Sequence, residues 1–185
     1  MPALPTDLAP LVLRLRAGDR AAFETLFRAV HGPLVRYART FDADEAEDAV
    51  QDALLKLWRR RETLDPERSV KALLYASVRN QLLNRSRDLA RRDELHGTMT
   101  APSDTALPDD DLDAALLGER LRAWLGELPA RQQEAFRLSR FDGLSYAEVA
   151  GVMACSTKTV ENHIGRALST LRDRIQRTAP DALLP

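Results

Sequence analysis

Five polar side chains near the end of the chain recur at the spacing of one helix face. Lys158, Thr159, Asn162, Arg166 and Ser169 fall on one side of a helix when each residue turns it by about 100°. Short polar and basic side chains of this kind can bond base edges and phosphates. The pattern predicts a helix that reads nucleic acid. The polar face of an ordinary bundle helix is the alternative.

The opposite side of this helix is apolar, and the segment before it fits a helix-turn-helix. The inward positions are Val160, Ile164, Ala167, Leu168 and Leu171. Ser145 and Glu148 have the spacing of a capping box, which predicts a short helix over about 146–153. The next three residues form a tight connection ending in Ser156, which caps a last helix over roughly 157–177. A short helix, a turn and a longer helix make the helix-turn-helix pattern.

Charge is concentrated in a second place, in the first half of the chain. Acidic residues cluster between Asp42 and Asp52, and the stretch 56–92 then holds eleven basic and four acidic side chains. This asymmetry predicts two partners, one basic and one anionic. Solvation of an Arg-rich helical surface is the alternative.

Four helices are predicted in this first half. The first helix ends at Gly18, and Asp19 caps the second, which Gly32 and Pro33 kink or divide. The third helix covers 44–61, and the fourth runs from near Pro66 to about residue 92. The apolar positions of the four helices, in order, are Leu8, Val12 and Leu15; Phe23, Leu26, Phe27, Val30, Leu34 and Tyr37; Ala46, Val50, Ala53, Leu54 and Leu57; Val70, Leu73, Leu74, Val78 and Leu82.

The middle of the chain divides it into two domains. Residues 93–111 carry acidic, Pro, Gly, Ser and Thr residues without a helical period, which predicts a flexible acidic linker. The linker is followed by a helix that ends before Pro129, with these inward positions: Leu112, Leu116, Leu121, Trp124, Leu125 and Leu128. Another helix covers 130–140, and a turn lies at 142–143. We therefore expect an all-α protein with a helical bundle over 1–92, a linker over 93–111, a helix-turn-helix domain over 112–178 and a tail over 179–185.

Composition excludes several classes of protein. With 185 residues, 44% of them hydrophobic and 30% charged, the chain is of globular type. No apolar run reaches membrane-spanning length and no export signal is evident, so we expect a cytoplasmic protein. Cys155 has no partner for an internal disulfide and fits better as an apolar filler than as a redox sensor. We expect no metal, no cofactor and no catalytic site, because no ligand cluster, phosphate loop or nucleophile–base spacing appears.

Two stretches resemble a known family. The stretch 44–58 (DEAEDAVQDALLKLW) resembles the first domain, and 144–150 (LSYAEVA) with 156–168 (STKTVENHIGRAL) resembles the second domain, of the two-domain extracytoplasmic-function (group IV) sigma factors of bacterial RNA polymerase. Both occur in the family's order, on either side of the acidic segment. The resemblance implies a transcription initiation factor of the sigma-70 family that binds core RNA polymerase and directs it to promoters.

The resemblance also assigns roles to residues. The third helix would dock on the polymerase clamp, the fourth would grip and melt the −10 element, and the last would read the −35 element. The implied polymerase-binding residues are Glu47, Asp48, Gln51, Asp52, Leu55 and Trp58. The implied −10 residues are Arg79, Asn80, Asn84, Arg85 and Arg87. The implied −35 residues are Lys158, Thr159, Asn162, His163 and Arg166, with His163 either a contact or plain surface.

Some positions depart from the family's pattern. Val70 and the pair Leu73-Leu74 replace a frequent aromatic residue and a Trp-Leu pair, and Asn84 replaces a frequent aspartate. We therefore expect the family's general role at the −10 element, but we predict no base preference for this chain. A stand-alone helix-turn-helix regulator and a helical protein-binding adaptor are the other hypotheses. An anti-sigma partner is an expectation from the family alone.

Overall fold

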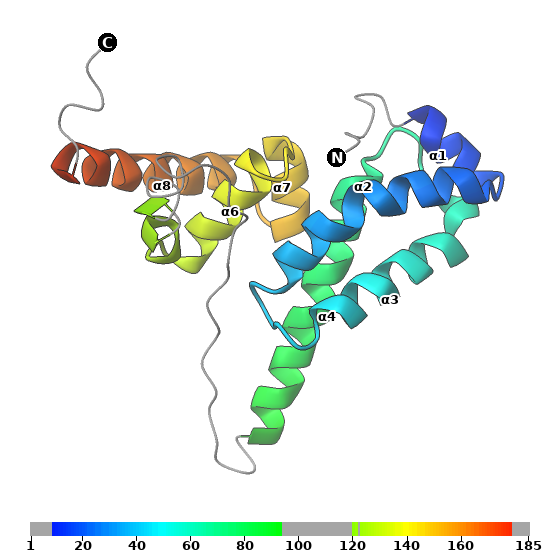
Figure 1. The fold of residues 1–185 in the computed structure, drawn as a ribbon, viewed down its shortest axis with the longest axis horizontal. Helices are drawn as coiled ribbons and strands as arrows, with labels where there is room; N and C mark the ends of the chain where they lie inside the picture. Colours follow the sequence, from blue (N-terminus) through cyan, green and yellow to red (C-terminus); the bar gives the residue numbers. More distant parts are fainter. Residues whose placement is uncertain (1–8, 94–119, 122, 179–185) are drawn as a thin grey trace. The chain divides into compact units, whose positions relative to one another are not determined.

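The computed structural model describes residues 9–93, 120–121 and 123–178, which fall in two compact units, residues 1–105 and residues 106–185. In these described ranges every regular element is a helix and there is no strand (Figure 1). The all-α class is confirmed. The first residue of the expected linker, Asp93, is the last residue of the fourth helix. The rest of the linker, the tail, and the inward positions Leu8, Leu112 and Leu116 lie outside the described residues.

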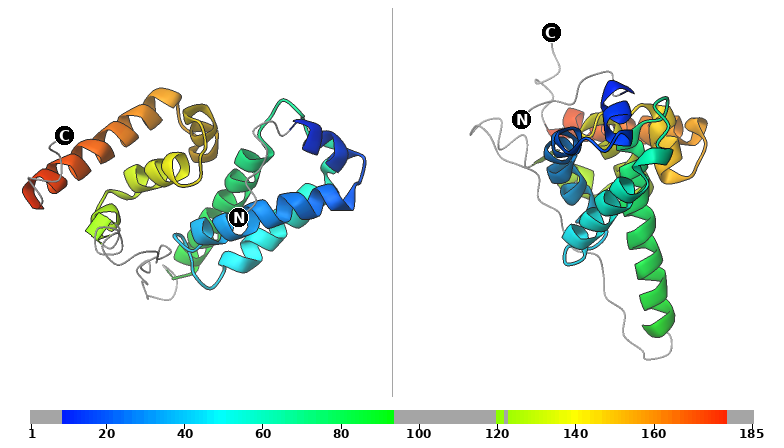
Figure 2. Two further views of the ribbon diagram at one scale, coloured as in Figure 1. Left: turned by 45° about the horizontal axis from the view of Figure 1, so that its top comes forward. Right: turned by 90° about the vertical axis from the view of Figure 1, so that its right-hand side faces the viewer.

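Over its described residues, 9–93, the first unit is a bundle of four α-helices and one short 3-10 turn. Its elements are α1 (Ala9–Arg16), α2 (Arg20–Ala38), α3 (Ala46–Arg59), η1 (Arg61–Thr63) and α4 (Val70–Asp93). Helices α2, α3 and α4 pack against one another in pairs, while α1 packs on α2 and η1 (Figures 1 and 2). The helix α3 therefore lies in contact with both long neighbours.

The turn between α1 and α2 follows the sequence prediction. Gly18 has a φ of 78°, which suits a residue without a side chain. The Asp19 carboxylate then accepts from the backbone amides of Ala21 and Ala22 at 2.8 and 3.2 Å, and from Arg14 Nε at 2.8 Å. The Arg14 guanidinium, together with these amides, holds the pKa of the Asp19 carboxyl below its ordinary value. Helix α2 continues through Pro33 without a break.

The boundaries of the next two helices differ from the prediction. Helix α4 begins at Val70 and not near Pro66, because Asp65 closes a turn in which its carboxylate accepts from the Glu67 amide at 3.0 Å. Ser69 caps α4 by accepting from the Ala72 amide at 3.2 Å. The third helix is shorter than predicted at both ends, because Asp42 holds the amides before α3 and η1 follows it.

The core of the first unit contains most of the predicted apolar positions. Tyr37 and Tyr75 are buried with ring centroids 5.0 Å apart, and each buried large side chain contributes roughly 1.5–3 kcal/mol. The prediction was wrong for Leu73, which is 51% exposed, and Phe27 is also exposed, at 38%. The other buried apolar side chains of the three long helices are Ala22, Leu26, Val30, Leu34, Val35, Ala38, Ala46, Ala49, Val50, Ala53, Leu54, Leu57, Val70, Leu74, Val78 and Leu82.

The second unit consists of a helical segment over 120–126, in which residue 122 is not described, followed by α6 (Ala130–Arg140), α7 (Tyr146–Met153) and α8 (Thr157–Thr178). Helices α6, α7 and α8 pack against one another. The bounds of α6 and α7 agree with the sequence prediction. Leu128, Phe136, Ala167 and Leu171 form part of its buried core, against which Trp124 packs.

Helix α7 has well-defined caps at both ends. Ser145 Oγ accepts from the Glu148 amide at 3.3 Å, and the Glu148 carboxylate accepts from the Ser145 amide at 2.7 Å, so the predicted capping box is present. At the other end Ala154 has φ 52° and ψ 51°, a left-handed conformation. Ser156 then caps α8, since its Oγ accepts from the Thr159 amide at 3.1 Å. This is helix-turn-helix geometry.

The left-handed cap predicts a stabilising substitution. Ala154→Gly should raise the free energy of unfolding by about 0.5–1 kcal/mol, because the strain on an L side chain there exceeds the extra chain entropy of glycine. Gly143→Ala is the matched control: φ is 66° and a Cβ would meet nothing within 4 Å, so only backbone strain is added and stability should fall. Urea unfolding followed by circular dichroism measures both. Equal midpoints for Ala154→Gly and the parent would contradict this account.

Candidate polymerase and nucleic-acid interfaces

One exposed stripe of α3 joins three of the residues assigned to polymerase binding. Asp48, Gln51 and Leu55 are all exposed, Leu55 at 49%, and their spacing of three and four residues places them on one helix face. An apolar side chain flanked by an acid and an amide suits a protein interface with a charged rim.

The other three residues of that set are engaged inside the first unit. Glu47 is paired with His31 at 3.4 Å and with Arg39 at 3.7 Å. Asp52 Oδ2 accepts from Gln81 Nε2 at 2.9 Å. The Trp58 ring lies 5.0 Å from the Phe23 ring, and the Arg61 guanidinium carbon lies 4.8 Å from the Trp58 ring centroid. These side chains therefore border the exposed stripe and do not belong to it.

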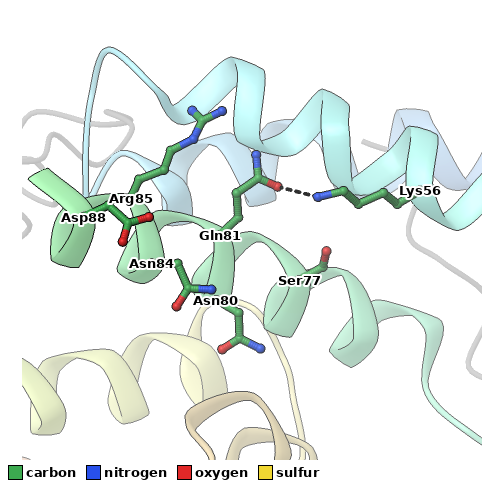
Figure 3. Close-up of a pocket in the computed structure, with 7 residues that line it drawn as sticks. All are labelled: Lys56, Ser77, Asn80, Gln81, Asn84, Arg85 and Asp88. Carbon is green, nitrogen blue, oxygen red and sulfur yellow. Dashed lines mark hydrogen bonds between the residues drawn. The ribbon is translucent and has the colours of Figure 1, made fainter.

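The exposed face of α4 carries three of the residues assigned to the −10 element. Asn80, Asn84 and Arg87 are exposed at a spacing of four and three residues, and in Figure 3 Asn80 and Asn84 point away from α3. They can offer two amides, each both donor and acceptor, and one fixed positive charge. Those are the groups needed to bond an unpaired base and a phosphate.

An open pocket of about 450 Å³ lies along this part of α4. Its lining residues are Lys56, Ser77, Asn80, Gln81, Asn84, Arg85 and Asp88 (Figure 3). Lys56, Ser77, Gln81 and Asp88 were not predicted as site residues from the sequence. Helical spacing could have identified them, because residues 77, 81, 84 and 88 share one face of α4 and Lys56 lies one turn after Asp52 on α3.

Two arginines of the −10 set are placed differently from the expectation. Arg79 is only 5% exposed, so its guanidinium belongs to the interior of the first unit and not to the surface of α4. Helical spacing explains this, because Arg79 shares its face with the buried Tyr75 and Leu82. Arg85 is half-buried and forms an ion pair with Glu45, just before α3.

The predicted outward face of α8 is exposed at its central positions. Lys158, Asn162 and Arg166 are exposed, whereas Thr159 and His163 are half-buried. Lys158 Nζ lies 3.0 Å from Glu161 Oε2, and the Thr159 hydroxyl lies 2.8 Å from that of Ser156 at the cap. Three side chains able to reach DNA thus occupy consecutive turns.

The inward face of α8 also follows the prediction, with one exception. Val160, Ile164, Ala167 and Leu171 are buried, but Leu168 is 37% exposed. Gly165 lies beside Arg166 on the exposed side, and a Cβ there would meet nothing within 4 Å. The outward face therefore has a flat position between its polar side chains.

The described residues contain neither a cluster of metal ligands nor a membrane-spanning helix. Across 9–93 and 120–178, except residue 122, no three His, Cys, Asp or Glu side chains gather as metal ligands would. Among the helices that the structure describes, none has the length and apolar character to cross a membrane. Cys155 is a free, half-buried cysteine.

Comparison with known proteins identifies both units. Residues 26–92 match the family Sigma-70 region 2, and residues 118–171 match the family Sigma-70, region 4. The RNA polymerase sigma factor CnrH of Cupriavidus metallidurans is 32% identical over 177 residues, which cover 87% of this chain and 90% of CnrH. The ECF RNA polymerase sigma factor SigL of Mycobacterium tuberculosis is 29% identical over 167 residues, which cover 86% and 94%.

The chain belongs to the ECF sigma factors. This family lies within the sigma-70 family, as the two region matches require. The chain is therefore an initiation factor that binds core RNA polymerase and promoter DNA and directs the polymerase to promoters. A match to region 2, in addition to the helix-turn-helix region, favours this function over a stand-alone regulator.

Solved structures of two sigma factors agree with this fold. The structure of CnrH in complex with the cytosolic domain of CnrY aligns with a TM-score of 0.60 at 27% identity, covering 92% of this chain and 98% of that one. The sigma factor RpoE in complex with the anti-sigma factor NepR from Bartonella quintana aligns with a TM-score of 0.62 at 24% identity, covering 91% and 94%.

Proposed function

We propose that the two units of this ECF sigma factor divide promoter recognition between them. Residues 1–92 act on core polymerase and the −10 element, residues 112–178 act on the −35 element, and residues 93–111 join them. The observation that carries this proposal is that α3, α4 and α8 each present polar side chains on one exposed face. Asp48, Gln51 and Leu55 form the polymerase-facing stripe, with Glu47, Asp52 and Trp58 at its borders.

The first unit is proposed to grip the opened −10 element with α4. Asn80 and Asn84 bond the exposed edges of unpaired bases, and Arg87 contacts a phosphate. Arg85 adds its charge at the pocket, where it is paired with Glu45. Arg79 is left out because it is buried.

The second unit is proposed to read duplex DNA with α8. Asn162 and Arg166 contact base edges in the major groove, and Lys158 contacts a phosphate near the start of the helix. Thr159 and His163 are half-buried and border that contact. The flat position at Gly165 allows the helix backbone to approach the duplex closely.

Further features are proposed from family membership. We place the chain in group IV of the sigma-70 family, in the cytoplasm with the polymerase, and without catalytic residues of its own. An anti-sigma protein is a proposed partner, because CnrH was solved in complex with the cytosolic domain of CnrY, and the similarly folded RpoE was solved with the anti-sigma factor NepR. Such a partner would restrain the factor until a signal releases it.

Reconstituted transcription tests the proposed function. The chain is mixed with core RNA polymerase and fragments of genomic DNA, and start sites are mapped on the transcripts. We expect transcripts that begin at defined sites and require the chain. Specific DNA binding without any effect on the polymerase would favour the stand-alone regulator, and binding of neither would favour the adaptor.

Reversal of one charge tests the polymerase-facing stripe. Asp48→Arg should weaken binding to core polymerase at least tenfold, because it places a like charge against basic partner groups at an interface. The combination with Asp52→Arg should abolish binding. Glu67→Arg is the matched control, since it reverses an exposed charge outside α3 and should leave binding unchanged. Titration of labelled polymerase measures all three, and normal binding by a folded double variant would exclude this assignment.

Alanine substitutions on α8 separate base reading from phosphate contact. Asn162→Ala or Arg166→Ala should cost roughly 1–3 kcal/mol of DNA-binding free energy and relax the preference at one base pair. Lys158→Ala should weaken binding to all DNA sequences equally and lower the slope of log K against log[salt]. Stability should change by no more than about 0.5 kcal/mol, because the sites are exposed. Arg172→Ala, also exposed on α8, is the control.

The probe for these variants is the upstream element of a promoter found by reconstituted transcription, with point variants of that element, titrated with the full chain at several salt concentrations. Parent-like binding of every sequence by all three variants would show that this face is ordinary solvent surface.

A further inference from the structure

Three polar side chains form a hydrogen-bonded chain between α3 and α4. Gln81 Nε2 donates to Asp52 Oδ2 at 2.9 Å. Lys56 Nζ donates to Gln81 Oε1 at 3.2 Å, the bond drawn as a dashed line in Figure 3. Asp52 and Lys56 are one turn apart on α3, while Gln81 comes from α4. The amide of one helix therefore joins an acid and a base of the other.

The charges at either end fix which way the amide of Gln81 points. A carboxylate only accepts hydrogen bonds and an ammonium only donates them, so the NH₂ group must face Asp52 and the oxygen must face Lys56. Hydrogen bonds to charged groups are stronger than those between neutral groups. A glutamate or a lysine at position 81 would satisfy one neighbour and repel the other.

The chain of hydrogen bonds lies between the two surfaces assigned to the first unit. Asp52 borders the stripe of α3 that carries Asp48 and Gln51. Lys56 and Gln81 line the pocket that also contains Asn80. The Lys56 side chain is exposed, so an ordering contact with Gln81 limits the positions that its ammonium can take.

We propose that Gln81 is a positioning residue that holds the Lys56 ammonium at the pocket, where Lys56 contacts a phosphate of the opened promoter strand. The proposal rests on the proposed function of α4. The Asp52 bond holds the Gln81 amide in one orientation, and the Lys56 bond places a positive charge beside the amides that bind the bases. Lys56 thereby becomes a DNA-contacting residue on the helix that also docks on polymerase.

The salt dependence of DNA binding tests this proposal. A single-stranded fragment of the −10 region from a mapped promoter is titrated with holoenzyme preassembled at saturating polymerase. Lys56→Ala should weaken binding roughly two- to fivefold and lower the slope of log K against log[salt] by about 0.7, the loss of one phosphate contact to a single strand. Gln81→Leu should lower the slope in the same direction, and the double variant should lower it no further than Lys56→Ala alone.

The controls separate positioning from folding and from the proposed function itself. Gln176→Leu makes the same chemical change at an exposed site of α8 and should keep the parent slope. Thermal unfolding verifies that each variant is folded, and a loss of stability alone leaves the slope unchanged. A parent holoenzyme that fails to bind the strand would refute the proposed function.

Two results with an active parent holoenzyme would overturn the inference. If Lys56→Ala keeps the parent slope, Lys56 contacts no phosphate. If Lys56→Ala lowers the slope but Gln81→Leu does not, Gln81 does not position Lys56. Lowered slopes in both, without additivity, support the inference.

Discussion

Burial of a narrow stripe of small side chains on α3 determines how the first unit is built. Ala46, Ala49 and Ala53 are almost completely buried at spacings of three and four residues, and α3 contacts both α2 and α4. Small side chains at a helix contact allow close approach of the two backbones. Polar residues at the edges of the stripe then reach the neighbouring helices, as Glu47 reaches His31 and Asp52 reaches Gln81. The stripe with Asp48 and Leu55 is the part of α3 that remains exposed.

In α8, as in α3, packing against the core determines which side chains stay exposed. One face of α8 must be apolar to pack on the rest of the second unit, so only the opposite face is free to meet DNA. The first turn of that face is also needed for the helix cap. Thr159 shows the resulting conflict: it lies within the predicted outward set, but its hydroxyl is close to that of the capping Ser156. On the next two turns Asn162 and Arg166 are exposed, so they are the outward polar side chains that neither the cap nor the core engages.

Local signals predicted the second unit better than the first. The capping box at Ser145 and the turn at Gly143 act within a few residues, and the bounds of α6 and α7 followed from them. The start of α4 was misplaced because Pro66 suits the first turn of a helix, whereas the bonds of the Asp65 turn compete with that start. The burial of Arg79 and the exposure of Leu73 depend on which face of α4 meets the bundle. Polar and apolar residues are mixed around α4, so the sequence of this helix alone does not determine its buried face.

The tryptophans give each unit its own optical reporter. The chain has two. Trp58 contacts the Phe23 ring and the Arg61 guanidinium in the first unit, and Trp124 packs against the buried cluster of the second. Fluorescence emission from an indole depends on its surroundings, so Trp58 reports the contact between α2 and α3, whereas Trp124 reports the core behind the helix-turn-helix. A single Trp→Phe change at either site leaves one signal, and the unfolding of each unit can then be followed separately in the intact chain.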